Sequence, residues 1–103
     1  MEKIIYAEGF FNDLERIVDF IKAVNAPLCE ETVTLIYEAV SILQRHPNIG
    51  RPAEHGLKEL LISQGRNGYV ALYRFRQDLH QIRILALRHQ REAGYADDKE
   101  AKH

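Results

Sequence analysis

The sequence predicts an α+β fold in which a hairpin of two helices packs on one face of a small, mainly antiparallel sheet. Two successive segments repeat apolar residues at helical spacing, and three later segments rich in β-branched and aromatic residues are joined by short turns. A short β-preferring segment precedes both helices. The expected element order is therefore β-α-α-β-β-β.

The opening strand is expected at residues 3–7, where Ile and Tyr side chains favour extended backbone. The first helix is expected from about Phe10 to Val24, because apolar residues recur there at alternating intervals of four and three. The second helix, from about Pro27 to His46, repeats this spacing and ends before Pro47. Cys29 falls on its apolar stripe, so we expect a small core residue rather than a reactive thiol.

Three strands are expected after an irregular loop at residues 47–56, namely Leu57–Ile62, Tyr69–Arg76 and Gln81–Leu87. The turns at residues 64–68 and 77–80 are short, which predicts an antiparallel meander. The last strand has apolar residues on both sides, as is typical of a central strand. The face of the sheet away from the helices is left for function or for a partner.

Length and composition indicate a single domain of the soluble globular class. The chain has 103 residues, of which 46% are hydrophobic and 28% charged. We assign the domain to residues 1–95 and expect a flexible, charged tail at residues 96–103. No apolar stretch approaches the roughly 20 residues that span a bilayer, no secretory signal is evident, and a single cysteine excludes an intramolecular disulfide. A cytoplasmic protein without a membrane partner is expected.

The net charge of −1 conceals a strong asymmetry along the chain. Residues 1–44 contain three Lys or Arg against eight Asp or Glu, whereas residues 45–91 contain nine against three. Eight of those nine basic residues are arginines, whose planar fork suits carboxylate and phosphate acceptors. An anionic partner for the second half is one interpretation, and a solvated sheet face paired with the acidic helices is the other.

The sequence contains no motif for most classes of enzyme chemistry. The five histidines are widely spaced and there is no second cysteine, so no metal site is expected, and no cofactor-binding motif is present. One group of reactive residues follows the last strand, and it contains Arg88, His89, Arg91, Glu92 and Tyr95. These residue types can move a proton and stabilise negative charge, as metal-free RNA cleavage requires. The residues alone favour the alternative, a cluster that binds the tail or a protein partner.

The whole chain resembles the RelE/ParE family of type II toxin-antitoxin toxins. The matching segments, in chain order, are Asp13–Ile17, His46–Pro52, Leu57–Leu60, Gly68–Arg74 and Ile82–His89. The resemblance implies the family's β-α-α-β-β-β fold and a small bacterial growth-inhibiting toxin. It also implies a cognate antitoxin that holds the toxin inactive, in a heterodimer or a larger assembly.

Two branches of this family differ in target, and residue matches separate them. RelE-like members are ribosome-dependent mRNA endonucleases, and ParE-like members inhibit DNA gyrase. The RelE-like arginine after the tyrosine of the middle strand corresponds to Val70 here. The C-terminal Arg and Tyr of those nucleases correspond to His89 and Tyr95, so the arginine is replaced by histidine. A ParE-like gyrase inhibitor without nuclease chemistry is therefore favoured.

Three functional hypotheses follow from these matches. The first is a gyrase-binding toxin. The second is a ribosome-dependent mRNA endonuclease with His89, Arg91 and Tyr95 as catalytic residues, and the third is a degenerate member that binds antitoxin without toxicity. In each case we expect an acidic antitoxin segment to contact the arginines of the sheet, namely Arg74, Arg76, Arg83 and Arg88.

Overall fold

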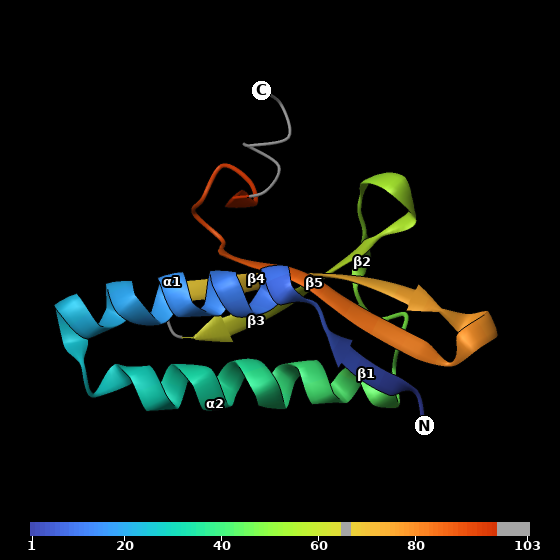
Figure 1. Ribbon diagram of the computed structural model, residues 1–103, viewed down its shortest axis with the longest axis horizontal. Helices are drawn as coiled ribbons and strands as arrows, with labels where there is room; N and C mark the ends of the chain where they lie inside the picture. The colour runs from blue at the N-terminus through green and yellow to red at the C-terminus, as the bar shows by residue number, and fades with distance from the viewer. Residues whose placement is uncertain (65–66, 97–103) are drawn as a thin grey trace.

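The computed structural model describes residues 1–64 and 67–96. The main elements, in chain order, are β1 (Lys3–Tyr6), α1 (Glu8–Asn25), α2 (Leu28–Ser41), β2 (Arg51–Pro52), β3 (Lys58–Gln64), β4 (Asn67–Arg76) and β5 (Gln81–His89) (Figure 1). The strands form one sheet in the order β1-β5-β4-β3-β2, in which β1 runs parallel to β5 and the other neighbours are antiparallel. The predicted fold class, with two helices on a mainly antiparallel sheet, is confirmed.

Both helices contribute to a single core against one face of the sheet. Phe10 and Ile17 of α1, and Ile36 and Val40 of α2, join the same buried cluster as alternate residues of β3, β4 and β5. The apolar stripe of α1 ends earlier than its periodicity predicts, because Val24 is 72% exposed. Beyond Ile21, this end of the helix hairpin extends past the strands that would cover it.

The second helix is shorter than the predicted span from Pro27 to His46. The α-helix ends at Ser41 and continues as a 3₁₀ turn, Ile42–Gln44. Leu43 is nevertheless fully buried, so the apolar pattern continues through the turn. Such a tightened last turn is common at helix ends, and the periodicity of apolar residues alone does not distinguish it.

The sheet has five strands rather than the four expected, because β2 forms within the predicted loop. This strand has only two residues, and it pairs Arg51 with Glu59 at the edge of the sheet. Two further 3₁₀ turns are Glu54–Gly56 and Gln77–Leu79. Two residues are too few to show the alternation of apolar and polar side chains by which a strand is predicted from sequence. Its proline is tolerated because the strand lies at the edge of the sheet.

Tyr73 fastens the loop after the second helix to the centre of the sheet. Its fully buried hydroxyl donates to the carbonyl oxygen of Pro47 (2.8 Å) and accepts from the N–H of Gly50 (2.9 Å). A Cβ atom at Gly50 would lie 2.5 Å from the Tyr73 hydroxyl oxygen. Only glycine fits this close approach.

A β-bulge in β5 changes which residues face the helices. Tyr73 pairs with Ile84 and Leu72 pairs with Ala86, so Leu85 has no partner of its own in β4. Before the bulge Ile82 and Ile84 face the helices, and after it Leu87 does. The bulge therefore accounts for part of the two-sided apolar pattern in this strand.

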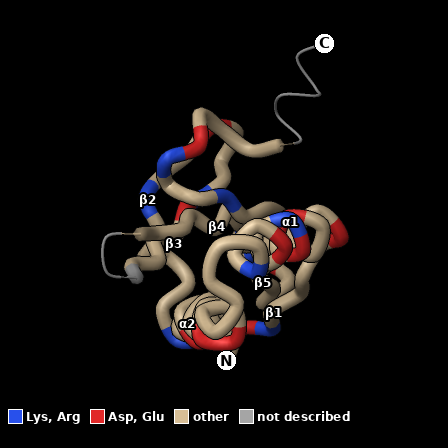
Figure 2. Tube along the Cα trace, turned by 90° about the vertical axis from the view of Figure 1, so that its left-hand side faces the viewer, with Lys and Arg blue, Asp and Glu red and all other residues tan. Residues whose placement is uncertain are grey.

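A second, smaller apolar cluster lies on the opposite face, which we call the outer face. Val70 and Ala86 are buried there under Tyr95, with Leu72 packed beside them. After β5 the chain turns back over the strands, on the side of the sheet away from α2 (Figures 1 and 2). We call residues 90–96 the 90–96 segment. Most of the tail expected at residues 96–103 lies outside the described residues.

Candidate functional site

The arginines of the outer face differ in their neighbours. The register of β4 and β5 places Arg74 directly opposite Arg83, and both residues are exposed. Within the described part of the chain neither guanidinium forms an ion pair, whereas Arg76 makes two hydrogen bonds to Asp78 (2.9 and 3.1 Å). Like charges directly opposite on neighbouring strands repel each other. The Arg74–Arg83 pair therefore has a physical reason to prefer an anionic partner.

A polar cluster farther along the outer face is centred on Glu59. Its Oε1 accepts a hydrogen bond from Arg51 Nε (2.9 Å), and its Oε2 accepts one from the Tyr95 hydroxyl (2.6 Å). Arg88 Nη2 lies 3.8 Å from Glu59 Oε2, and the Arg88 guanidinium carbon lies 5.1 Å from the centroid of the Tyr95 ring. The side chains of Glu59 and Arg88 are each only 14% exposed, so their interaction is weakly screened by water.

The cluster shifts the pKa values of two of its members in opposite directions. Burial raises the pKa of Glu59, but the hydrogen bonds from Tyr95 and Arg51 and the charges of Arg51 and Arg88 outweigh it, so that pKa lies below its ordinary value. Burial, and after it the Glu59 carboxylate, raises the pKa of Tyr95 far above its ordinary value. Tyr95 therefore keeps its proton at neutral pH and acts as a hydrogen-bond donor.

Arg88 also determines the path of the 90–96 segment. Its Nη1 lies 3.3–3.4 Å from the carbonyl oxygens of His89, Gln90 and Glu92. Because Tyr95 packs on the sheet a few residues later, the segment is held at both of its ends. Arg88 is thus a structural anchor, and its guanidinium is less available to a partner than those of Arg74 and Arg83.

His89 lies on the helix side of the sheet, opposite to Tyr95. It pairs with Tyr69 across β4 and β5, and the two rings pack edge to face with centroids 5.4 Å apart. His89 Nδ1 accepts a hydrogen bond from the backbone N–H of Arg91 (3.1 Å), which leaves the proton of the neutral ring on Nε2. The structure therefore brings His89 and Arg91 together but places Tyr95 on the other face.

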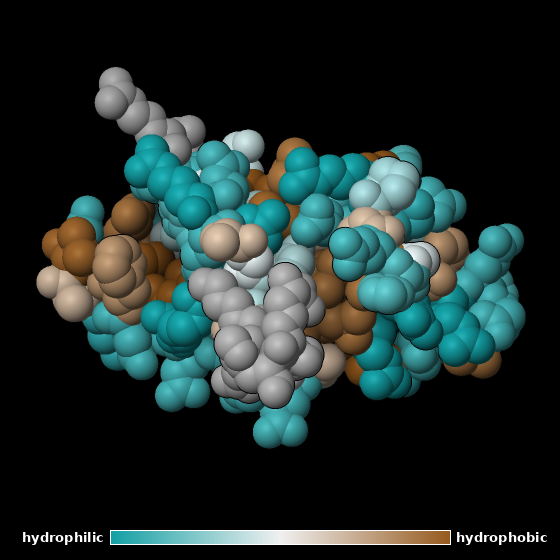
Figure 3. Space-filling model, turned by 90° about the horizontal axis from the view of Figure 1, so that it is seen from above, coloured by the Kyte–Doolittle hydropathy of each residue, from teal (hydrophilic) through white to brown (hydrophobic). Residues whose placement is uncertain are grey.

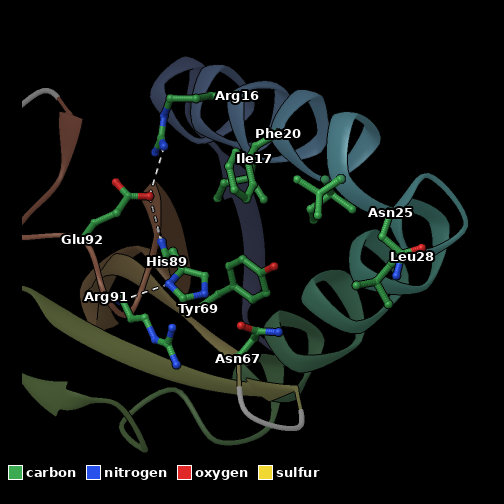
Figure 4. A pocket seen from close by; sticks show the side chains of 12 residues that line it. Arg16, Ile17, Phe20, Asn25, Leu28, Asn67, Tyr69, His89, Arg91 and Glu92 are labelled. Carbon is green, nitrogen blue, oxygen red and sulfur yellow. Dashed lines mark hydrogen bonds and ion pairs between the residues drawn. The ribbon is translucent and has the colours of Figure 1, made fainter.

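A groove of about 660 Å³ lies beside His89, between the second half of α1, the start of β4 and the end of β5 (Figure 4). Its apolar lining residues are Ile17, Phe20, Ile21, Val24, Leu28 and Tyr69. Its polar lining residues are Arg16, Asn25, Asn67, His89, Arg91 and Glu92. Two of the apolar lining residues, Phe20 and Val24, are 70% and 72% exposed. At the end of the molecule where α1 and α2 meet, apolar atoms reach the surface beside polar ones (Figure 3).

Two carboxylates with structural roles are not evident from the sequence. Asp13 lies three residues after Phe10 and four before Ile17, on the apolar side of α1, where it is 5% exposed and accepts a hydrogen bond from the N–H of Leu87 (2.8 Å). Glu59 contacts Tyr95 across 36 positions of sequence. No local pattern connects residues this far apart. The signal for Asp13 is its spacing from Phe10 and Ile17, which places a carboxylate on the apolar side of the helix, whereas Glu59 directly follows Lys58 and gives no such signal.

Two searches of the described residues were negative. They contain no group of three or more His, Cys, Asp and Glu side chains placed to hold a metal ion. None of the helices in the described part of the chain is long and apolar enough to cross a membrane.

The arrangement of helices and strands is that of the toxins of toxin-antitoxin systems. A chain from the chromosomal ParDE toxin-antitoxin system of P. aeruginosa is 25% identical, with a TM-score of 0.69 over 84% of this chain and 94% of that one. A chain of the RelBE2 toxin-antitoxin complex of Mycobacterium tuberculosis shares the fold at 19% identity, with a TM-score of 0.56 over 86% and 98% of the two chains. A comparison with curated protein sequences finds no match.

The family itself is identified by sequence. The family model described as the ParE toxin of the type II toxin-antitoxin system, parDE, matches residues 4–94. The chain therefore belongs to the ParE toxin family. The predicted resemblance to RelE/ParE toxins is confirmed.

Proposed function

We propose that this ParE-family toxin inhibits bacterial growth by binding DNA gyrase in the cytoplasm, and that a cognate antitoxin neutralises it. The observation that supports binding over RNA cleavage is the separation of His89 and Tyr95 onto opposite faces of the sheet. Catalytic groups must lie within hydrogen-bond reach of one reacting centre. Tyr95, moreover, already donates to Glu59 and has a raised pKa, which makes it a poor proton acceptor.

Val70 also supports binding over RNA cleavage. Val70 is fully buried on the outer face, under Tyr95 and beside Ala86. An arginine at this position is the feature that the resemblance attributes to the RelE-like nucleases. A buried valine has no charge to offer a phosphate in the transition state, and losing one such group costs on the order of 10²–10³ in rate.

A gyrase supercoiling assay with purified toxin tests the proposal. We expect micromolar toxin to abolish supercoiling or to trap cleaved DNA, and added antitoxin to restore supercoiling. His89→Ala is a useful second sample, because a binding mechanism does not need an imidazole base and inhibition should persist. Full supercoiling activity in the presence of micromolar wild-type toxin would refute gyrase as the target.

The nuclease hypothesis retains one supporting observation. His89 and Arg91 line the same groove, and Arg91 is exposed there, so a base and a cation lie side by side. A ribosome-dependent endonuclease at this site predicts new mRNA 5′ ends after induction, which His89→Ala should abolish. Unchanged transcript ends would eliminate it. Normal growth on overexpression would indicate the third hypothesis, a family member without toxicity.

The outer-face arginines differ in whether a carboxylate of the same chain already pairs with them, and this affects how readily each could bind the antitoxin. Arg74 and Arg83 are exposed and have no carboxylate neighbour in the described chain, so they are proposed to meet acidic residues of the antitoxin. Arg76 and Arg88 interact with Asp78 and Glu59 respectively, and a partner would have to displace those contacts. Their contribution to binding is therefore proposed to be smaller.

A further inference from the structure

We propose that three cations in a row across the outer face, Lys3, Arg83 and Arg74, bind the phosphate backbone of duplex DNA. We call these residues the cation row. The choice of DNA rests on the proposed function, because gyrase acts on duplex DNA and a toxin bound to gyrase meets that DNA. The proposal goes beyond the contact of the two arginines with the antitoxin, since it gives the free toxin a ligand of its own on this surface.

The register of three neighbouring strands aligns the cation row. Arg74 of β4 lies directly opposite Arg83 of β5, and Lys3 of β1 pairs with Gln81, two residues before Arg83 in β5. Alternate residues of a strand share a face, so Lys3 lies on the same side of the sheet as the two arginines. Opposite residues of neighbouring strands are about 4.5–5.5 Å apart, and diagonal neighbours are roughly 7–8 Å apart. The three side chains can therefore contact one backbone together.

The cation row has no counter-charge within the described part of the chain. All three of its residues are exposed, and none of them forms an ion pair there. The carboxylates that contact other arginines of this face are already engaged, since Asp78 binds Arg76 and Glu59 accepts a hydrogen bond from Arg51. Neighbouring like charges repel each other, and a polyanion lying across the row relieves this repulsion.

The side chains around the row favour a duplex over a single strand. Proteins that bind single strands stack bases on aromatic side chains, whereas a duplex backbone is bound through its phosphates. The aromatic residues of β1 and of the second half of β4, Tyr6, Tyr73 and Phe75, pack with the core on the helix side. The outer-face neighbours of the row include the half-buried aliphatic residues Ile5 and Leu72. The row therefore offers charge to a backbone but no platform for an unpaired base.

The helix layer on the opposite side of the sheet carries the opposite charge. Together α1 and α2 contain seven Asp or Glu against two Lys or Arg (Figure 2). The net charge of −1 therefore conceals two faces of opposite sign. The field of such a molecule turns its basic face toward a polyanion during approach. DNA is accordingly expected on the outer face of the sheet and not across the helices.

The experiment measures binding of the full-length toxin to a fluorescein-labelled DNA duplex of about 30 base pairs by fluorescence anisotropy, at about 50 and 200 mM salt. We expect a dissociation constant on the order of 10⁻⁵ M at the lower salt, and three phosphate contacts predict a slope of about −3 for log K against log salt. Arg74→Gln combined with Arg83→Gln should weaken binding by about 10-fold or more and make the slope shallower by about 2. Lys3→Gln alone should weaken binding by about threefold.

A matched control removes two exposed cations away from the outer face. Lys22 lies on α1 and Arg91 lines the groove beside His89, and neither forms an ion pair among the described residues. Lys22→Gln combined with Arg91→Gln changes the net charge equally and should leave affinity for the duplex within about twofold. Thermal unfolding of each variant reports whether the fold is intact. The variants of the cation row should remain folded, because they remove a repulsion.

The outcomes separate this proposal from the proposed function, because DNA binding is measured without gyrase. No binding of the duplex by wild-type toxin, or an equal loss in both double variants, overturns the cation row as a DNA site while gyrase inhibition stands. Tighter binding to a single strand of the same sequence overturns the choice of duplex. Loss of antitoxin binding with unchanged DNA binding in the Arg74 and Arg83 double variant assigns the pair to an acidic protein and also overturns it. DNA binding that depends on the row, in a toxin that leaves supercoiling unaffected, refutes gyrase as the target and supports the surface.

Discussion

The two faces of the sheet differ in how closely the residues at and after the end of β5 are packed against the rest of the chain. On the outer face Glu59 contacts Arg51, Tyr95 and Arg88, and this cluster holds the 90–96 segment, although the buried Nε of Arg88 has no hydrogen-bond partner among the described residues. On the helix face, at the end of the same strand, His89 and Arg91 border an open groove with exposed apolar side chains. The comparison teaches that Tyr95, despite its position in a nuclease-like motif, belongs to the folded framework, whereas His89 belongs to an accessible surface.

The largest expected effect on stability comes from removing Glu59, the centre of the polar cluster on the outer face. Glu59→Ala should lower the free energy of unfolding by about 2–4 kcal/mol, because it leaves the largely buried Arg88 without a counter-charge and Tyr95 without an acceptor. Urea denaturation of the two proteins measures the difference. Glu54→Ala, at a side chain that is 94% exposed, is the matched control and should change stability by less than about 0.5 kcal/mol. Equal stability of Glu59→Ala and wild type would contradict a stabilising role of the polar cluster centred on Glu59.

The difference in stability between wild type and Glu59→Ala should depend on pH in a defined direction. The pKa of Glu59 in the folded protein lies below its ordinary value of 4.5, so the unfolded state binds the proton more readily. The stabilisation is therefore fully present above about pH 5 and is lost as the pH falls through the folded-state pKa. The stability gap between wild type and Glu59→Ala should accordingly be constant near neutrality and narrow in acid. A gap that widens in acid would contradict the assigned direction of the shift.

A smaller effect is expected when only the hydroxyl of Tyr95 is removed. Tyr95→Phe keeps the ring over Val70 and Ala86 but deletes the hydrogen bond to Glu59, at a cost of about 1–2 kcal/mol. Growth inhibition at a temperature where the variant is folded should be unchanged, because the hydroxyl supports the fold. Complete loss of toxicity in a stably folded variant would instead assign Tyr95 to the chemistry. Tyr37→Phe is a suitable control, since Tyr37 is half-buried and its hydroxyl has no partner in the described chain.

The smallest effect concerns the two arginines that face each other on the outer face. Arg83→Glu converts a like-charge pair with Arg74 into an opposite-charge pair and should raise stability by up to about 0.5 kcal/mol at low salt. The same change should slow association with an acidic antitoxin. Reversing both arginines to glutamate restores the repulsion and should remove the gain in stability. An association rate insensitive to these changes and to salt would exclude this pair from the interface.

The sequence predicts the fold well because helical and strand periodicities are local. The stripe through Ile17 and Ile21 and the alternation around Ile82 and Ile84 identify core positions that the structure confirms. Local patterns fail where geometry intervenes. The periodicity of α1 includes Val24, but no other element covers that turn of the helix, and its exposure creates the groove wall.

The candidate site was less predictable than the fold for a physical reason. Arg88, His89, Arg91 and Tyr95 are close in sequence, which suggests one cluster, but neighbours along a strand face opposite sides of the sheet. The contacts that distinguish their roles involve Glu59, Asp13 and Arg16, which come from β3 and α1. Such contacts depend on the tertiary fold and leave no mark in the local sequence.

The extra residue in β5 has a consequence for comparing relatives. If all residues of the strand were paired regularly with β4, positions 86–89 would change sides, and His89 would face the same side as Tyr95. A relative that lacks a residue at position 85 would keep the sides found here without any bulge. Spacing within the C-terminal motif is therefore a poor guide to homologous roles, and equivalent histidines and tyrosines have to be assigned from hydrogen-bond register.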